Sequence, residues 1–118
     1  MALNPTGLEF AINSLQTGLL YAQIHSGSAS DGTANIAVVG RQPIYWTTPS
    51  SGSFGLASPL VFSGGPSYGT AYSVTLWDQE TDGSMMGEIT LTGGDTTFNG
   101  DGVYQVTVID FTLLASDV

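Results

Sequence analysis

The chain has 118 residues, no cysteine and a formal net charge of −9, because Arg41 is its only Lys or Arg against ten Asp and Glu. This length fits one domain over residues 1–118, and the missing cysteines exclude disulfides and thiolate metal sites. The scarcity of basic side chains argues against nucleic acid as a partner, and no run of about 20 apolar residues is available for membrane insertion.

The composition nevertheless predicts a folded domain. Only 9% of the residues are charged, and the mean hydropathy is +0.18. A disordered acidic chain would be less hydrophobic, so we expect a surface made mostly of Ser, Thr, Gly, Asn and Gln. Such a weakly charged surface suits a subunit that remains in contact with neighbouring proteins.

The N-terminal segment predicts one short α-helix at about residues 5–17. Asn4 can cap the free backbone N–H groups, and Pro5 takes the first helical position. Gly18 provides a natural end. Apolar residues recur at helical spacing along one face, namely Leu8, Ile12, Leu15 and Leu19.

The rest of the chain predicts about six to eight short strands. The clearest covers residues 72–78, where apolar and polar residues alternate as in a strand with one buried face, and Trp77 predicts that its end is covered on both faces. Pro59 predicts a break or an edge position. The other expected strands cover residues 19–25, 35–39, 42–48, 54–62, 85–91 and 103–114. This rhythm favours a mainly β fold, an antiparallel β-sandwich or small barrel with one N-terminal helix.

The segment 78–83 has the spacing that begins a calcium loop. Asp78, Glu80 and Asp82 occupy positions one, three and five, and a Gly follows at position six. The twelfth position, Ile89, lacks the expected carboxylate. A solvated hairpin turn is therefore the simpler interpretation, with a calcium site as the alternative.

No catalytic or cofactor-binding constellation is predicted, and we do not expect an enzyme. His25 is the only histidine, and one histidine among many acids does not define a catalytic triad. We interpret it as a polar residue at a strand end. We expect Arg41 to pair with an acidic side chain such as Glu88 or Asp110, which lie in apolar strand contexts.

Several aromatic residues could furnish a stacking platform for a sugar. Aromatic residues in alternating strands more often belong to the core, and burial of Trp46 and Trp77 would argue against such a platform. The five candidates are Tyr45, Trp46, Tyr68, Tyr72 and Trp77.

Five segments in a fixed order resemble a family of small structural proteins of tailed bacteriophages, especially those of actinobacteria. These segments are Met1-Ala-Leu-Asn-Pro-Thr-Gly-Leu8, His25-Ser-Gly, Arg41-Gln-Pro-Ile-Tyr-Trp46, Val74-Thr-Leu-Trp-Asp78 and Phe98-Asn-Gly-Asp-Gly-Val-Tyr104. The resemblance covers nearly the whole chain. Many family members have Thr-Ala-Asp-Pro-Gly after the histidine, whereas this chain has Ser26-Gly-Ser-Ala-Ser-Asp31-Gly.

The resemblance implies a helix followed by a β-sandwich and a virion protein made in the bacterial cytoplasm. Family members are usually described as tail-fibre-like or minor tail proteins. We expect a tail-associated assembly subunit that forms a ring or trimer and binds other phage structural proteins. A capsid decoration protein and a receptor- or carbohydrate-binding module are the alternatives.

We expect assembly to use open strand edges and the N-terminal region. The candidate partner-binding segments are residues 1–7 and the helix face formed by Leu8, Ile12 and Leu15. The net negative charge favours a basic surface on the partner.

Overall fold

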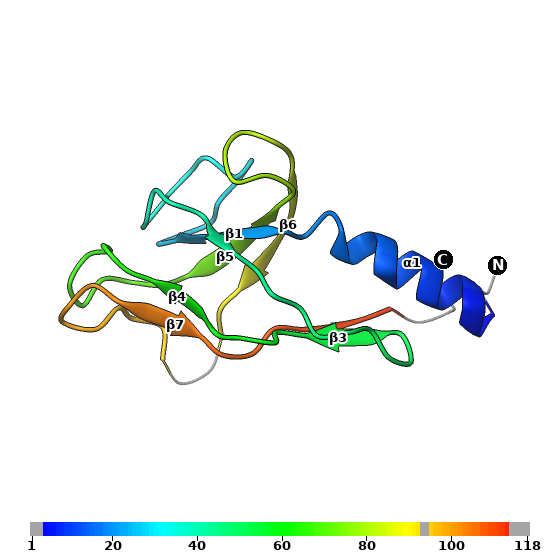
Figure 1. The fold of residues 1–118 in the computed structure, drawn as a ribbon. Coiled ribbons are helices and arrows are strands. Elements are labelled where there is room, and N and C mark those ends of the chain that lie inside the picture. The colour runs from blue at the N-terminus through cyan, green and yellow to red at the C-terminus, as the bar shows by residue number, and fades with distance from the viewer. Residues whose placement is uncertain (1–3, 93–94, 114–118) are drawn as a thin grey trace.

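One α-helix and eight strands form the part of the chain that the computed structural model describes, residues 4–92 and 95–113 (Figure 1). The elements are α1 (Pro5–Gln16), β1 (Tyr21–His25), β2 (Gln42–Pro43), β3 (Ser53–Gly55), β4 (Leu60–Phe62), β5 (Ser73–Trp77), β6 (Met85–Thr90), β7 (Tyr104–Val106) and β8 (Asp110–Thr112). All strand pairs are antiparallel, so the predicted mainly β fold with one short helix is confirmed.

Helix α1 begins as its local sequence predicts. The Asn4 side chain accepts a hydrogen bond from the Gly7 N–H at 2.8 Å, and Pro5 occupies the first helical position. The helix ends at Gln16, with Thr17 as its C-cap, one residue before the expected end. These are short-range signals, which explains why the sequence located the helix closely.

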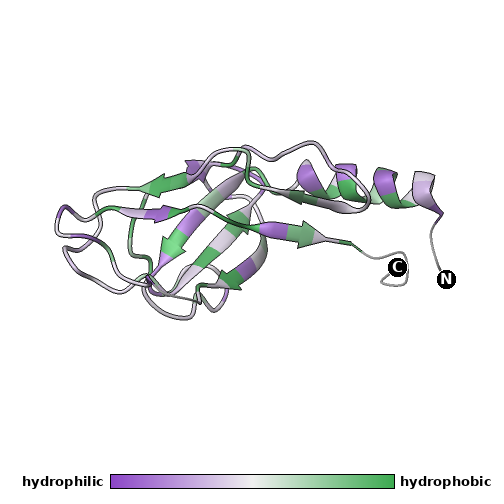
Figure 2. Cartoon of the chain, turned by 90° about the horizontal axis from the view of Figure 1, so that it is seen from below, coloured by the Kyte–Doolittle hydropathy of each residue, from purple (hydrophilic) through white to green (hydrophobic). Residues whose placement is uncertain are grey.

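The larger sheet has the strand order β2-β1-β5-β6. Strands β1 and β5 pair along five residues, from Tyr21 opposite Trp77 to His25 opposite Ser73. Apolar and polar bands alternate along these strands (Figure 2). One face therefore carries an apolar set, Ala22, Ile24, Val74 and Leu76, and the other a polar set, Gln23, His25, Ser73 and Thr75.

The apolar face of this sheet packs against a two-stranded ribbon formed by β4 and β7. Phe62, fully buried, and Tyr104 lie opposite each other in this ribbon and belong to the same core cluster as Ile24 and Val74. The ribbon lies beneath the sheet in Figure 1. The described sheets do not close on themselves, which favours the open, sandwich-like alternative over a barrel.

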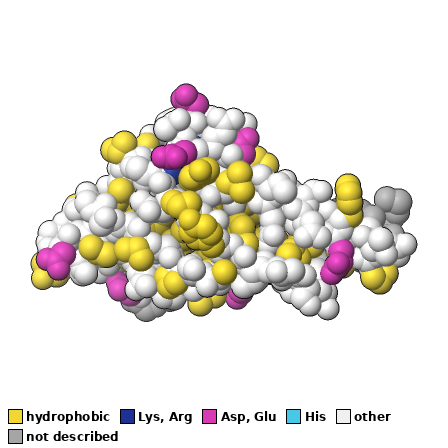
Figure 3. All heavy atoms as spheres, in the orientation of Figure 1, with side chains coloured by type: hydrophobic (Ala, Val, Ile, Leu, Met, Phe, Trp, Pro, Cys, Tyr) yellow, Lys and Arg dark blue, Asp and Glu magenta, His cyan; other side chains and the backbone are white. Residues whose placement is uncertain are grey.

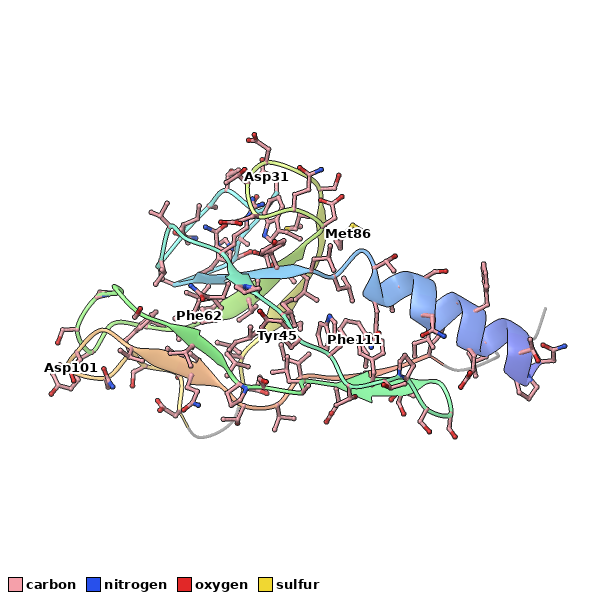
Figure 4. All side chains as sticks on the ribbon, viewed as in Figure 1. Asp31, Tyr45, Phe62, Met86, Asp101 and Phe111 are labelled. Atoms are coloured by element: carbon pink, nitrogen blue, oxygen red, sulfur yellow. The ribbon has the colours of Figure 1, made fainter. Side chains whose placement is uncertain are left out.

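Helix α1 and a second ribbon, β3 with β8, extend from this body in the same direction (Figure 1). The described part of the molecule measures 48 × 28 × 20 Å, and the first turn of α1 lies at the far end of the extension. Phe54 and Phe111 stack at 5.3 Å, and the Trp46 ring lies nearly perpendicular to both, with its centre 5.0 and 5.8 Å from theirs. Figure 4 shows Phe111 between the helix and β3. The aromatic cluster thus joins the helix to its own ribbon.

Four of the expected strands differ in the structure. The strand expected at residues 103–114 is divided into β7 and β8, which pair with β4 and β3 respectively, and residue 114 lies outside the described residues. Residues 35–39 make only an isolated bridge between His25 and Ile36, and residues 42–48 contribute only the two-residue β2. Residues 54–62 are split into β3 and β4, as Pro59 predicted. All five residues of β5 are buried, because the loop 26–41 covers the polar face that was expected to meet solvent.

Candidate interaction surface

Strand β6 is an open edge of the larger sheet. It pairs with β5 on one side and is the last strand in the sheet order. It has six residues, more than any other described strand. Its sequence, Met-Met-Gly-Glu-Ile-Thr, contains neither Pro nor Lys; the features of this edge that can limit pairing are the charge of Glu88 and the bulge opposite Leu76 and Trp77 at its start. β6 can therefore act as a template for pairing with another chain.

The register shows which backbone groups of β6 point away from β5. The Leu91 N–H donates to the Tyr72 carbonyl at 2.8 Å, which identifies a hydrogen-bonded pair. Such pairs alternate along an antiparallel ladder. Ile89 is therefore also bonded to β5, whereas Glu88 and Thr90 direct their N–H and C=O groups outward. No described residue hydrogen-bonds to these outward groups.

Two chemically different faces flank the open edge. Glu88 lies opposite Thr75 and therefore on the polar face of the sheet. Ile89 lies opposite Val74 on the core face, where Ile89 and Leu91 are half-buried and pack against the core. A strand added to β6 would therefore place alternate residues beside a carboxylate and beside an apolar surface.

The Glu88 carboxylate is fixed by the covering loop. The Ala29 N–H donates to Glu88 Oε2 at 2.9 Å. Hydrogen bonds from the Ser73 hydroxyl and then from Ala29 lower the pKa of Glu88 below its ordinary value of 4.5, and His25 adds a smaller effect. The Ser73 hydroxyl has one proton, which it shares between Glu88 and the Gly27 carbonyl, 3.3 Å away. The Ala29 contact therefore fixes the position of the carboxylate at the edge of the sheet.

We expect the contribution of Glu88 to stability to be pH-dependent. Its pKa is lowered on folding, so the stabilisation is present above the unfolded value of about 4.5 and is lost as the pH falls through the folded value. Urea unfolding of the wild type and Glu88→Gln at pH 6 and pH 3 should show a larger difference at pH 6. Hydrogen bonds from Thr33 lower the pKa of Asp31 in the same way. Asp31 is present in both proteins, so its pH-dependent contribution cancels when their stabilities are subtracted. An equal difference at both pH values would contradict the prediction.

Acidic residues gather around the start of β6 and its polar face. The loop 26–41 lies close to the start of β6. A Cβ atom added at Gly32 would come within 2.6 Å of the Trp77 ring and 3.0 Å of the Met85 sulfur. Figure 4 shows Asp31 beside the loop that precedes β6, and Figure 3 shows acidic side chains at this end of the molecule. The acids of these two loops and of β6 are Asp31, Asp78, Glu80, Asp82 and Glu88, half of the ten in the chain.

The three calcium candidates do not converge in the structure. No group of three or more His, Asp or Glu side chains suited to a metal ion occurs among the described residues. Asp78 instead accepts a hydrogen bond from the Ser84 N–H at 2.7 Å and closes the turn. Asp82 and Glu80 are exposed. The arrangement matches the simpler interpretation, a hairpin turn.

Arg41 holds this turn in place. Its Nη1 donates to the carbonyls of Gln79 and Asp82 at 2.9 and 2.7 Å. Its guanidinium lies 3.6 Å from the centre of the Trp77 ring, a cation–π contact. The expected pairing with the Glu88 or Asp110 carboxylate is therefore wrong. Because its partners are carbonyl oxygens, Arg41 leaves the surrounding carboxylates without a neutralising bond from this side chain.

The predicted partner-binding face of the helix packs inside its own chain. Ile12 is fully buried, and Leu15 packs against the same core cluster. A side chain at Gly52 would lie 3.0 Å from Leu8, which places Leu8 against the turn before β3. The side chain of Ile12 is therefore buried within its own chain and is not accessible to a partner in this conformation. Phe10, 76% exposed, is the large apolar residue that α1 presents to solvent.

An open groove of about 500 Å³ lies between α1 and the segment that follows β2. Its lining combines polar helix residues with apolar residues, namely Asn13, Gln16, Thr17, Leu20, Ile44, Tyr45 and Trp46. Tyr45 is 62% exposed, and hydrophobic side chains gather across the middle of this face (Figure 3). Tyr45 lies near the centre of the molecule in Figure 4.

The five aromatic residues considered for sugar binding do not form one platform. Trp77 is buried beneath Arg41. Trp46 is half-buried, and its indole N–H donates to the Leu19 carbonyl at 2.7 Å. The other three, Tyr45, Tyr68 and Tyr72, are exposed. Because both tryptophans are used in packing, their arrangement argues against a shared stacking surface.

The buried polar face of β1 and β5 forms a closed hydrogen-bond cluster. His25 is fully buried; its Nδ1 donates to the Ala34 carbonyl, and its Nε2 lies 2.8 Å from Thr75 Oγ1. The Trp77 indole N–H donates to the same oxygen at 2.8 Å. The Gln23 amide donates to the Val39 carbonyl at 2.6 Å. His25 therefore ties the covering loop to the sheet, in agreement with its interpretation as a structural polar residue.

The open edge is a feature that the sequence did not assign to a residue range. Its signal was the alternation in residues 85–91 without Pro or Lys, but alternation does not distinguish an edge strand from a central one. Comparisons with protein-family models, curated proteins and solved structures find no match. None of the described helices has the length and apolar character needed to cross a bilayer.

Proposed function

We propose that this protein is a structural virion protein of a tailed bacteriophage, a minor tail or tail-associated assembly subunit. The observation that carries the proposal is the open edge of β6, with the outward N–H and C=O groups of Glu88 and Thr90. In monomeric proteins, exposed strand edges of this length are usually protected against pairing with another chain. An assembly subunit instead uses such an edge for a neighbour.

Two further features support this proposal. The order of motifs along the chain resembles that of small phage structural proteins, and the net charge of −9 keeps unassembled copies from aggregating. The ring or trimer that we propose for the particle would use other surfaces. The exposed apolar residues Leu20 and Tyr45, in the groove beside α1, are available for contacts between copies.

Immunogold labelling of intact phage tests the proposal. Serum raised against the whole chain should place gold on the tail or the tail tip, and serum from the same animal before immunisation should not. Gold spread over the head would instead favour a capsid decoration protein. A structural role would be overturned if purified virions bound no gold and an immunoblot of them did not detect the chain.

A further inference from the structure

We propose that the open edge of β6 binds an extended segment of a different protein in which basic and apolar residues alternate. This inference specifies the partner of the assembly surface and so rests on the proposed function. Addition of a strand to an exposed edge is an established mode of peptide recognition, in which the backbone supplies affinity and alternate side chains supply specificity.

The two faces of β6 determine the alternation. Residues of the added strand on one face would lie beside Glu88, whose exposed carboxylate is ionised at neutral pH and accepts a hydrogen bond from the Ala29 N–H. Residues on the other face would cover the half-buried Ile89 and Leu91. Opposite charges across neighbouring strands are favourable and like charges are not. The matching segment therefore carries Lys or Arg at one set of positions and apolar residues at the other.

The surrounding charge extends this preference beyond one pair. Asp31 and the acids of the loop 78–84 lie on the same side of the sheet as Glu88 or at the start of β6. The only Lys or Arg of the chain, Arg41, donates hydrogen bonds to the carbonyls of Gln79 and Asp82. A basic segment would therefore approach a surface whose negative charge attracts it over several ångströms.

A second copy of this chain does not meet these requirements. With a single Lys or Arg among 118 residues, no segment of the chain can supply a basic alternating face. Pairing of β6 with β6 would bring the two Glu88 carboxylates onto one face of the joined sheet. Each copy also carries a net charge of −9, so the charge favours a different protein as the partner.

Binding of a short labelled peptide to the full chain tests the proposal. The probe is a fluorescein-labelled peptide of about eight residues in which Lys and Val alternate, and fluorescence anisotropy reports binding. A peptide of the same composition, with its Lys residues at one end and its Val residues at the other, controls for charge alone. We expect the alternating peptide to bind more tightly than the block peptide, and its binding to weaken as ionic strength rises from about 0.05 to about 0.5 M.

Two pairs of variants locate the site on β6. Thr90→Pro removes an outward N–H without breaking a bond to β5, and should weaken binding at least about tenfold. Thr90→Ala keeps that N–H and should bind as the wild type does. Glu88→Gln keeps an acceptor for Ala29 but removes the charge, and should weaken binding about twofold to fivefold. Glu9→Gln removes one exposed charge on α1 and should have no effect.

Three results would overturn the proposal. The first is equal binding of the alternating and block peptides, and the second is unchanged binding to Thr90→Pro when circular dichroism shows a native fold. The third is a dimer in sedimentation that Thr90→Pro dissociates, which would make a second copy the occupant of the edge. The phage labelling experiment is independent of these measurements. If phage tails are labelled but the alternating peptide does not bind, the proposed partner is rejected and the structural role is not. If the peptide binds but virions are not labelled, the structural role is rejected and the peptide-binding edge is not.

Discussion

Replacing Ile12 with Ala should destabilise the protein by about 2–5 kcal/mol, the usual cost of truncating a fully buried aliphatic side chain. Ile12 has no exposed surface and belongs to the core cluster that includes Phe54. The substitution leaves a cavity on the buried face of α1, in the core cluster that also contains Phe54 and has Phe111 packed against it.

Phe10→Ala is the matched control on the same helix. Phe10 is 76% exposed, so its truncation should change stability by no more than about 0.5 kcal/mol. Urea unfolding followed by far-UV circular dichroism measures both variants. If Ile12→Ala were as stable as Phe10→Ala, α1 would not be packed on its own ribbon in solution. The Leu8, Ile12 and Leu15 face would then be free to dock on a partner.

The sequence predicted those elements that depend on short-range signals. Asn4 and Pro5 act within one turn of the helix, so its start could be located from the residues alone. Residues 72–78 carried a clear alternation and form the central strand β5. Pro59 correctly predicted the division between β3 and β4. In each case a few neighbouring residues determine the outcome.

The sequence did not predict what covers the polar face of the sheet. Ser73 and Thr75 were expected to face solvent by their alternation with apolar residues, but the loop 26–41 buries them. Gly32 lets this loop lie against Trp77, where any side chain would clash. The presence of Trp77 among the polar residues was the available signal. Contacts between a long loop and a distant strand leave little trace in local patterns.

The candidate interaction surface was predictable only in part. The alternation in residues 85–91 predicted β6 itself, but its place at the end of the sheet depends on which other segments fail to pair with it. The expectation of a basic partner rests on composition alone, since Arg41 is the only Lys or Arg of the chain. The engagement of Arg41 with the carbonyls of Gln79 and Asp82 required the structure.

Replacing Thr75 with Val should destabilise the protein by about 2–4 kcal/mol, although the two side chains have nearly the same shape. Thr75 Oγ1 accepts a hydrogen bond from the Trp77 indole and lies 2.8 Å from His25 Nε2. Thr75 and His25 are fully buried, so valine leaves two polar groups without partners. Each such loss costs about 1–3 kcal/mol, and the methyl group gained offsets only part of it. Urea unfolding measures the change.

Thr112→Val is the control, because Thr112 is exposed in β8 and should tolerate the same change within about 0.5 kcal/mol. A double-mutant cycle with Trp77→Phe then isolates the bond between the indole and Thr75. Phenylalanine has no N–H to leave unpaired, so Thr75→Val should cost less in the Trp77→Phe background than in the wild type. Additive effects, or a Thr75→Val protein as stable as the wild type, would mean that the hydroxyl does not hold this cluster together. In that case the apolar contacts of the loop 26–41, rather than the His25 cluster, would keep the polar face of the sheet covered.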